Sequence, residues 1–243
     1  MTVRKFDSRE GMGQAAAEAI AAAVGAVLRG KEVVRIVFAA APSQKEVLRA
    51  LAESEMAWGR VIAFHMDEYL GLEPGAPQGF GNFLRDRLFS KVPLKQVHYL
   101  NGQAADPLEE CRRYARLLEQ HPPDIVVLGI GENSHLAFND PHAALFDDPL
   151  TVKVVELDAN CRRQQVNDGC FATIEEVPTH ALTLTIPALM QAGSVFGIVP
   201  GKRKAAAVWH TLHSEICERY PSTILRRHPN VALYLDEDSG GHG

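Results

Sequence analysis

Short apolar runs alternate with longer amphipathic stretches along most of the 243-residue chain. Most of the runs have strand length and lack polar alternation, which is typical of strands covered on both faces of a sheet. We predict strands over residues 33–38, 61–66, 98–100, 151–157, 182–186, 195–199 and 231–235, and in the run from Ile125 that ends at Gly129 and Gly131.

The stretches between these runs carry helix signals. An alanine-rich segment has Ile20, Val24 and Leu28 at helical spacing, and Gly30 follows as a stop. Asp106 and Pro107 are typical of a helix start. We predict helices over residues 8–29, 44–53, 80–89, 107–120 and 187–191, and from 200 to about 213.

This alternation predicts an α/β fold, a Rossmann-like doubly wound and mostly parallel sheet with helices on both faces. No internal repeat or low-complexity linker interrupts the chain, so we expect one domain over residues 1–243. Ligands of such sheets bind at the carboxyl ends of the strands. The loops near Ala41, Asp67, Gly131 and Pro200 should therefore gather around one site.

Composition narrows the classes of function. The net charge of -5 gives no reason to expect a nucleic-acid partner. The four cysteines form no CxxC pair, so neither a zinc signature nor a disulfide framework is indicated. The first residues lack an apolar signal core, and no apolar run approaches the length of a membrane span. We expect a cytoplasmic protein without a membrane partner.

Two of the strand-end loops carry groups that can move protons. Asp67 stands directly after a predicted strand, and a carboxylate there could act as an acid or base. His135 lies in a polar cluster behind Gly131 and is the first candidate for chemistry. The alternative in both places is a turn whose Asp and Asn side chains satisfy local backbone groups.

Two further loops could bind an anion. Ser43 precedes a predicted helix whose free N–H groups could hold a phosphate, but Ser43 and Glu46 also fit a capping box that would satisfy the same groups. Lys202, Arg203 and Lys204 open a later helix, where three cations oppose the helix dipole unless an anion binds. The alternative there is a solvated basic turn.

Two segments carry a family resemblance. The first, 65–72, reads His-Met-Asp-Glu-Tyr-Leu-Gly-Leu and resembles the Met-Asp-Glu-Tyr-x-Gly-Leu motif of the glucosamine-6-phosphate deaminase/isomerase family. The second, 129–141, reads Gly-Ile-Gly-Glu-Asn-Ser-His-Leu-Ala-Phe-Asn-Asp-Pro and resembles that family's Gly-x-Gly-x-Asp-Gly-His-Ile-Ala-Phe-Asn-Glu-Pro motif. The broader superfamily also contains 6-phosphogluconolactonases.

The resemblance implies conversion of glucosamine 6-phosphate, or a related amino sugar phosphate, to fructose 6-phosphate and ammonia without a metal or organic cofactor. Asp67 occupies the place of the enolising carboxylate, which moves a proton between C2 and C1. His135 matches the histidine that assists ring opening. Asp140 matches the glutamate that orients this histidine.

The same resemblance implies a set of phosphate-binding residues. Lys204 matches a phosphate-binding lysine, and either Arg162 or Arg163 matches its arginine partner. Ser43 lies in the equivalent of the phosphate loop, where alanines replace the usual glycine and threonine. The family includes monomers and hexamers, so a homo-oligomer is compatible with it.

The main departure from the family is Asn133, which replaces an aspartate beside the histidine. A neutral amide can hydrogen-bond but supplies no charge for a protonated imidazole. Asp140 could hold the imidazolium alone, or Glu132 could turn inward. Ser134 also replaces a glycine. These changes predict a divergent member of the family.

Two alternatives to the deaminase or isomerase stay open. A sugar lactone hydrolase would use His135 as a general base to activate water. A catalytically silent sugar-phosphate sensor would bind its ligand through Lys204 and Arg162 without turnover.

Overall fold

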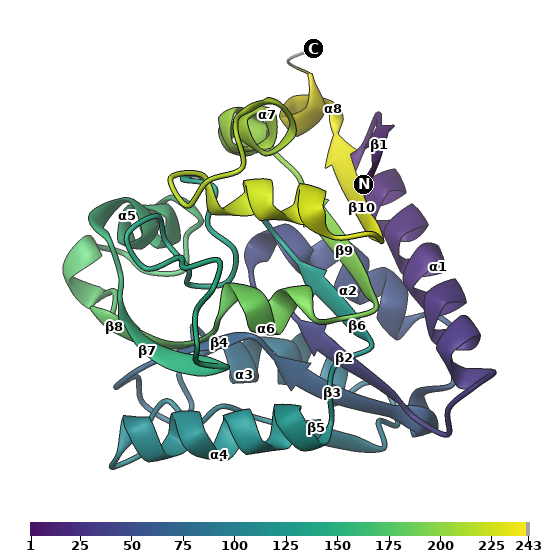
Figure 1. Cartoon of the computed structure of the whole chain (residues 1–243), viewed down its shortest axis with the longest axis horizontal. Helices are drawn as coiled ribbons and strands as arrows, with labels where there is room; N and C mark the ends of the chain where they lie inside the picture. Colours follow the sequence, from purple (N-terminus) through teal and green to yellow (C-terminus); the bar gives the residue numbers. More distant parts are fainter. Residues whose placement is uncertain (242–243) are drawn as a thin grey trace.

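The computed structural model describes residues 1–241 and is built on a seven-stranded sheet in which all neighbouring strands are parallel (Figure 1). The predicted α/β class with a mostly parallel sheet is confirmed. In spatial order the strands are β1 (Thr2–Phe6), β10 (Val231–Asp236), β9 (Ser194–Val199), β6 (Ile125–Leu128), β2 (Val34–Phe38), β3 (Val61–His65) and β5 (Gln96–His98).

A second sheet lies beside the carboxyl end of β3. It has three antiparallel strands in the order β4 (Asp67–Tyr69), β8 (His180–Leu184) and β7 (Val152–Glu156). Only Met66 separates β3 from β4, so Asp67 stands where the two sheets meet.

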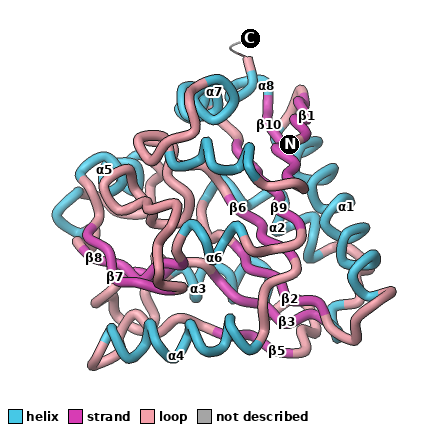
Figure 2. Tube along the Cα trace, viewed as in Figure 1, coloured by secondary structure: helices cyan, strands magenta, loops and turns pink. Residues whose placement is uncertain are grey.

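Helices cover both faces of the large sheet (Figures 1 and 2). Alternate residues of the central strands enter two hydrophobic cores, as Ile125 and Val127 do in one and Val126 and Leu128 in the other. The helices are α1 (Arg9–Leu28), α2 (Lys45–Ala52), α3 (Phe80–Leu84), which continues as a π-helix (Arg85–Phe89), α4 (Pro107–Gln120), α5 (Ala159–Asn167), α6 (Ile186–Met190), α7 (Ala205–His213) and α8 (Glu237–Gly240).

Helix α1 corrects the expectation that no apolar run approaches the length of a membrane span. Its 20 residues are long and apolar enough to span a membrane by length and composition alone. In the fold, Met12, Ala16 and Ile20 are fully buried and α1 packs along α2. Its apolar face therefore covers the sheet.

Four elements were not predicted, one of which is the short C-terminal helix α8. Strand β1 is mostly exposed and lies at the sheet edge, so it carries no continuous apolar run. Strand β4 has only three residues. Helix α5 is strongly polar, although Asp158 caps its first turn by accepting a hydrogen bond from the Cys161 N–H. Strand β8 also begins and ends two residues earlier than predicted.

Candidate active site

His65, the last residue of β3, fixes the backbone of Asp67 through a hydrogen bond. The His65 ring is fully buried, and its Nδ1 lies 2.8 Å from the Asp67 carbonyl oxygen. Its Nε2 accepts a hydrogen bond from the Leu100 N–H, so Nδ1 is the donor in a neutral ring. Burial lowers the pKa of His65 to about 4, which keeps the ring neutral over the physiological range.

An inner cavity of about 60 Å³ opens at the carboxyl ends of the parallel strands. Asp67 and His135, predicted separately from two loops, both line it. Phe80 and Phe138 form its apolar part. The other lining residues are Ala39, Ala40, Ala41, Ser43, Gln44, Met66, Gly129, Ile130, Gly131, Ala137, Gln164, Gln165 and Lys204.

The Asp67 carboxyl group is poorly solvated. Its Oδ1 is buried and has no hydrogen-bond partner within residues 1–241. Burial, and next the charge of Glu68, raise the pKa of Asp67 well above its ordinary value. Glu68 points elsewhere, because its carboxylate accepts hydrogen bonds from the N–H groups of Tyr69, Phe80 and Gly81. A carboxyl group in this setting is suited to accepting and returning a proton.

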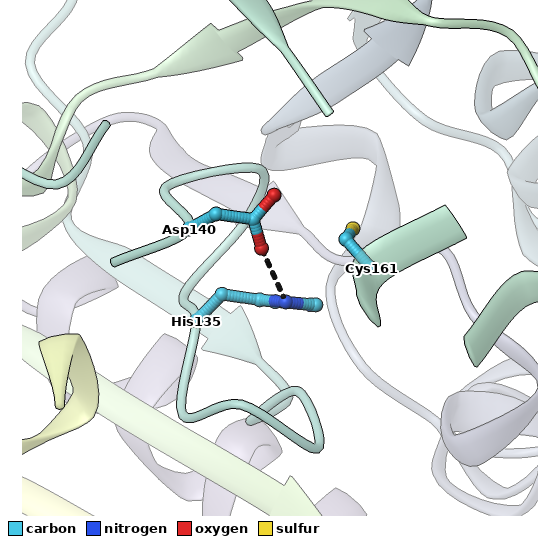
Figure 3. Close-up of side chains that lie close together, drawn as sticks. All are labelled: His135, Asp140 and Cys161. Atoms are coloured by element: carbon cyan, nitrogen blue, oxygen red, sulfur yellow. Dashed lines mark ion pairs between the residues drawn. The ribbon is translucent and has the colours of Figure 1, made fainter. Parts of the chain in front are cut away.

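His135 is paired with one carboxylate. Its Nδ1 lies 3.0 Å from Asp140 Oδ1 (Figure 3). Burial opposes ionisation of Asp140, but the contacts with His135 and Asn133 outweigh it and lower the pKa of Asp140. The ring also packs on Gly131, where an added Cβ would lie 2.2 Å from His135 Cε1. Glu132 lines a different cavity, so Asp140 is the carboxylate that holds this imidazole.

Asn133 bridges two carboxylates behind the histidine. Its Nδ2 donates to Asp140 Oδ1 at 2.9 Å and to Asp158 Oδ2 at 3.3 Å. Its Oδ1 accepts from the backbone N–H of His135 at 3.2 Å. A neutral amide fits here because an aspartate could not donate to either acid. Asn133 lines neither cavity, so its position favours a role in orienting His135.

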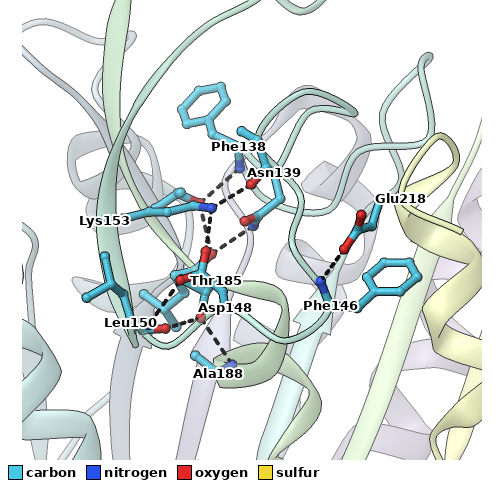
Figure 4. Close-up of polar contacts among 12 residues, drawn as sticks. Phe138, Asn139, Phe146, Asp148, Leu150, Lys153, Thr185, Ala188 and Glu218 are labelled. Carbon is cyan, nitrogen blue, oxygen red and sulfur yellow. Dashed lines mark hydrogen bonds and ion pairs between the residues drawn. The ribbon is translucent and has the colours of Figure 1, made fainter.

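The loop that carries His135 is fastened to the small sheet. The Phe138 N–H donates to Thr183 Oγ1, and Asn139 Nδ2 donates to the carbonyl oxygens of Leu136 and Leu184 (Figure 4). Ser134, which replaces the family's glycine, has a positive φ of 70°. The left-handed backbone there explains a preference for glycine.

Two of the predicted phosphate residues lie together. Ser43 and Lys204 line both the inner cavity and an adjoining outer cavity of about 320 Å³, which Arg9, Glu132, Asp168 and residues 200–203 also line. Lys204 makes no ion pair among the described residues. Burial lowers its pKa, against the opposing effect of nearby Asp168 and Glu132.

The capping box predicted at Ser43 does not form. No side chain caps the 3₁₀ turn (Pro42–Gln44) or α2, and Glu46 instead pairs with Arg9 at 3.1 Å. The N–H groups at this turn are therefore not satisfied by the predicted cap, which favours the anion-binding interpretation.

The arginine prediction needs correction. The Arg162 guanidinium donates to the carbonyl oxygens of Ile174 and Val177, away from both cavities. Arg163 is exposed and lines neither cavity. The inward residues of α5 are Gln164 and Gln165, which line the inner cavity beside Lys204. Their helical spacing from Cys161 was the signal that sequence reasoning missed.

The fold and the cavity define an α/β protein whose site combines a carboxyl group, an imidazole and a lysine ammonium. Residues 7–233 match the family described as glucosamine-6-phosphate isomerases/6-phosphogluconolactonase, and the chain belongs to this family.

Two curated proteins and one solved structure are similar to this chain over most of its length. A glucosamine-6-phosphate deaminase of Exiguobacterium is 43% identical over 72% of this chain and 67% of its own length. One from Bacillus cereus is 36% identical over 88% of this chain and 79% of its own. The solved structure of a monomeric glucosamine-6-phosphate deaminase has a TM-score of 0.90 at 27% identity, covering 99% of both chains.

Proposed function

We propose that the protein is a glucosamine-6-phosphate deaminase. It converts glucosamine 6-phosphate and water to fructose 6-phosphate and ammonia in amino sugar metabolism. The observation that carries the proposal is that Asp67, His135 and Lys204 line one cavity. The similarity to glucosamine-6-phosphate deaminases over most of the chain supports the choice of substrate.

Asp67 is the base of the isomerisation. Its ionised carboxylate takes the proton from C2 of the open-chain sugar and returns it to C1 through an enediol-like intermediate. Water then releases ammonia from C2. Within residues 1–241 no protein group donates to Oδ1, so none competes with the substrate for this oxygen.

His135 opens the sugar ring by moving a proton from the O1 hydroxyl to the ring oxygen. Asp140 stabilises the imidazolium that forms on the way, at the 3.0 Å separation of the resting pair. Asn133 orients the pair through its contacts with Asp140 and with the His135 N–H. The charge of the aspartate that the family carries at the position of Asn133 is therefore not needed for this pairing.

Lys204 and Ser43 hold the phosphate. They stand at the junction of the inner and outer cavities, so a phosphate there directs the carbon chain inward toward Asp67. Gln164 and Gln165 supply amide groups where an arginine partner was expected. The inner cavity alone is small for a ligand site, so substrate must widen it or extend outward.

The residues that line the two cavities run from Arg9 to Lys204, so we propose that residues 1–243 act as one catalytic domain. We also propose a cytoplasmic location, where sugar phosphates are available and the four free thiols stay reduced.

The test is release of ammonia and fructose 6-phosphate from glucosamine 6-phosphate by the purified protein. The same preparation is assayed for hydrolysis of 6-phosphogluconolactone. Deamination without lactone hydrolysis is the expected result. Lactone hydrolysis alone would replace the proposal with a lactonase, and binding of glucosamine 6-phosphate without turnover would replace it with a sensor.

A further inference from the structure

A cluster of three potential metal ligands lies beside the inner cavity. His135, Asp140 and Cys161 each offer one ligand atom, and these atoms all lie within 4.8 Å of one another (Figure 3). All three residues are buried. The loop after β6 supplies His135 and Asp140, while the first turn of α5 supplies Cys161.

The donor set is the one that zinc prefers. Zn²⁺ binds imidazole nitrogen, carboxylate oxygen and thiolate sulfur, with bonds of roughly 2.0–2.3 Å in tetrahedral sites. Such bonds place neighbouring ligand atoms about 3.3–3.6 Å apart. The His135–Asp140 contact of 3.0 Å already lies near this value. With all three atoms within 4.8 Å, the sulfur needs an inward shift of at most about 1 Å.

The imidazole nitrogen of the cluster makes no hydrogen bond within residues 1–241. His135 Nδ1 is buried and takes part in no hydrogen bond within the described part of the chain, despite its short distance to Asp140. The Cys161 Sγ lies within 4.8 Å of both partner atoms, so a cation that binds among them replaces the thiol proton.

We propose that His135, Asp140 and Cys161 form a binding site for one thiophilic divalent cation, best matched by Zn²⁺, and that its occupancy stops the deaminase reaction. The cation binds the neutral imidazole through Nδ1, the Asp140 carboxylate and the Cys161 thiolate. The thiol proton passes to solvent, and nothing is oxidised or reduced. The inhibitory part rests on the proposed function, because the cation ties down the imidazole that opens the sugar ring.

The test is a titration of the metal-free protein with Co²⁺, followed by the near-ultraviolet absorption that arises when a thiolate binds cobalt. We expect one equivalent to bind and Zn²⁺ to displace it. Cys161→Ser should abolish the absorption and weaken binding by at least about tenfold. Cys170→Ser is the matched control, since this thiol is not in the cluster, and it should behave like the wild type.

Activity provides the second readout. Zn²⁺ should inhibit the wild type and Cys170→Ser, whereas Cys161→Ser should turn over substrate and resist Zn²⁺. If Cys161→Ser does not fold by circular dichroism, His135→Gln is titrated with Co²⁺ instead and should bind at least about tenfold more weakly. Absence of the absorption in the wild type, or its persistence in a folded Cys161→Ser, overturns the metal site. Cobalt binding in a wild type that does not deaminate refutes the proposed function alone.

Discussion

Replacing Asp67 with asparagine should remove activity and raise stability together. The two side chains have nearly the same shape, and Asp67 Oδ1 has no hydrogen-bond partner in residues 1–241 that the change would remove. The loss of a general base typically lowers a rate by about 10²–10⁴-fold. We expect kcat to fall by this factor in Asp67→Asn.

The gain in stability follows from the raised pKa of Asp67. A carboxyl group whose pKa is higher in the folded protein favours folding below its unfolded pKa, and this contribution is lost as the pH rises through the folded pKa. At neutral pH the buried acid therefore opposes folding, and asparagine removes this opposition. We expect a gain of about 1–2 kcal/mol in the free energy of unfolding, or about 2–8 °C in Tm for a domain of this size.

The assay pairs ammonia release with thermal unfolding at several pH values. The Tm difference between Asp67→Asn and the wild type should narrow as the pH falls, because the wild-type acid then becomes protonated in both states. Asp86→Asn is the matched control, since that side chain is 62% exposed, and it should change neither quantity. A variant that retains more than a tenth of the wild-type activity, or that melts below the wild type, would refute the role assigned to Asp67.

Three further predictions concern the phosphate site, the histidine and the buried ring at the end of β3. Lys204→Met should raise KM for glucosamine 6-phosphate by about 10–100-fold, the usual worth of a hydrogen bond to a charged group, with a smaller change in kcat. Gly131→Ala should lower kcat by about 100-fold, because its Cβ would displace the His135 ring, whereas Gly75→Ala, with nothing within 4 Å, should be neutral. His65 has a lowered pKa of about 4, so its contribution to folding is present above its unfolded value of 6.5 and is lost as the pH falls through 4. Between pH 7 and pH 5 the wild type should lose about 2 kcal/mol more in urea unfolding than His65→Asn.

Each of these predictions has a result that contradicts it. Lys95 is exposed and lines neither cavity, so Lys95→Met should leave KM unchanged. An equal rise in KM at both lysines would show that the effect comes from the overall charge of the protein and not from a phosphate site. Full activity in Gly131→Ala would mean that the His135 ring is not confined as described. Equal pH dependence in the wild type and His65→Asn would show that the ring is not held neutral.

Burial on both faces made the central part of the fold predictable. The apolar run of β6 and the residues that follow β3 predict from the sequence alone that Asp67 and His135 lie at the carboxyl ends of strands. Strand β1 could not be recognised in this way, since its partner β10 lies at the other end of the chain and its own residues are mostly exposed. Pairing over that distance leaves no local pattern.

The phosphate side of the site was less predictable, because it depends on the direction in which α5 presents its residues. The charge of Arg162 made it the natural candidate, yet the helix turns its guanidinium toward the carbonyl oxygens of Ile174 and Val177. Gln164 and Gln165 are uncharged, so the sequence alone gives no reason to assign them to a phosphate site. Only the packing of α5 beside Lys204 brings them to the cavity.

Met66 ties the two sheets together with its own backbone. Its N–H donates to the Phe38 carbonyl of β2, and its carbonyl accepts from the Leu184 N–H at the end of β8. The backbone that carries Asp67 cannot move away from the large sheet without breaking one of these links, so its position is fixed on folding and not when substrate arrives. We therefore expect any opening that admits the sugar to come from another part of the cavity lining, such as α5 with Gln164 and Gln165.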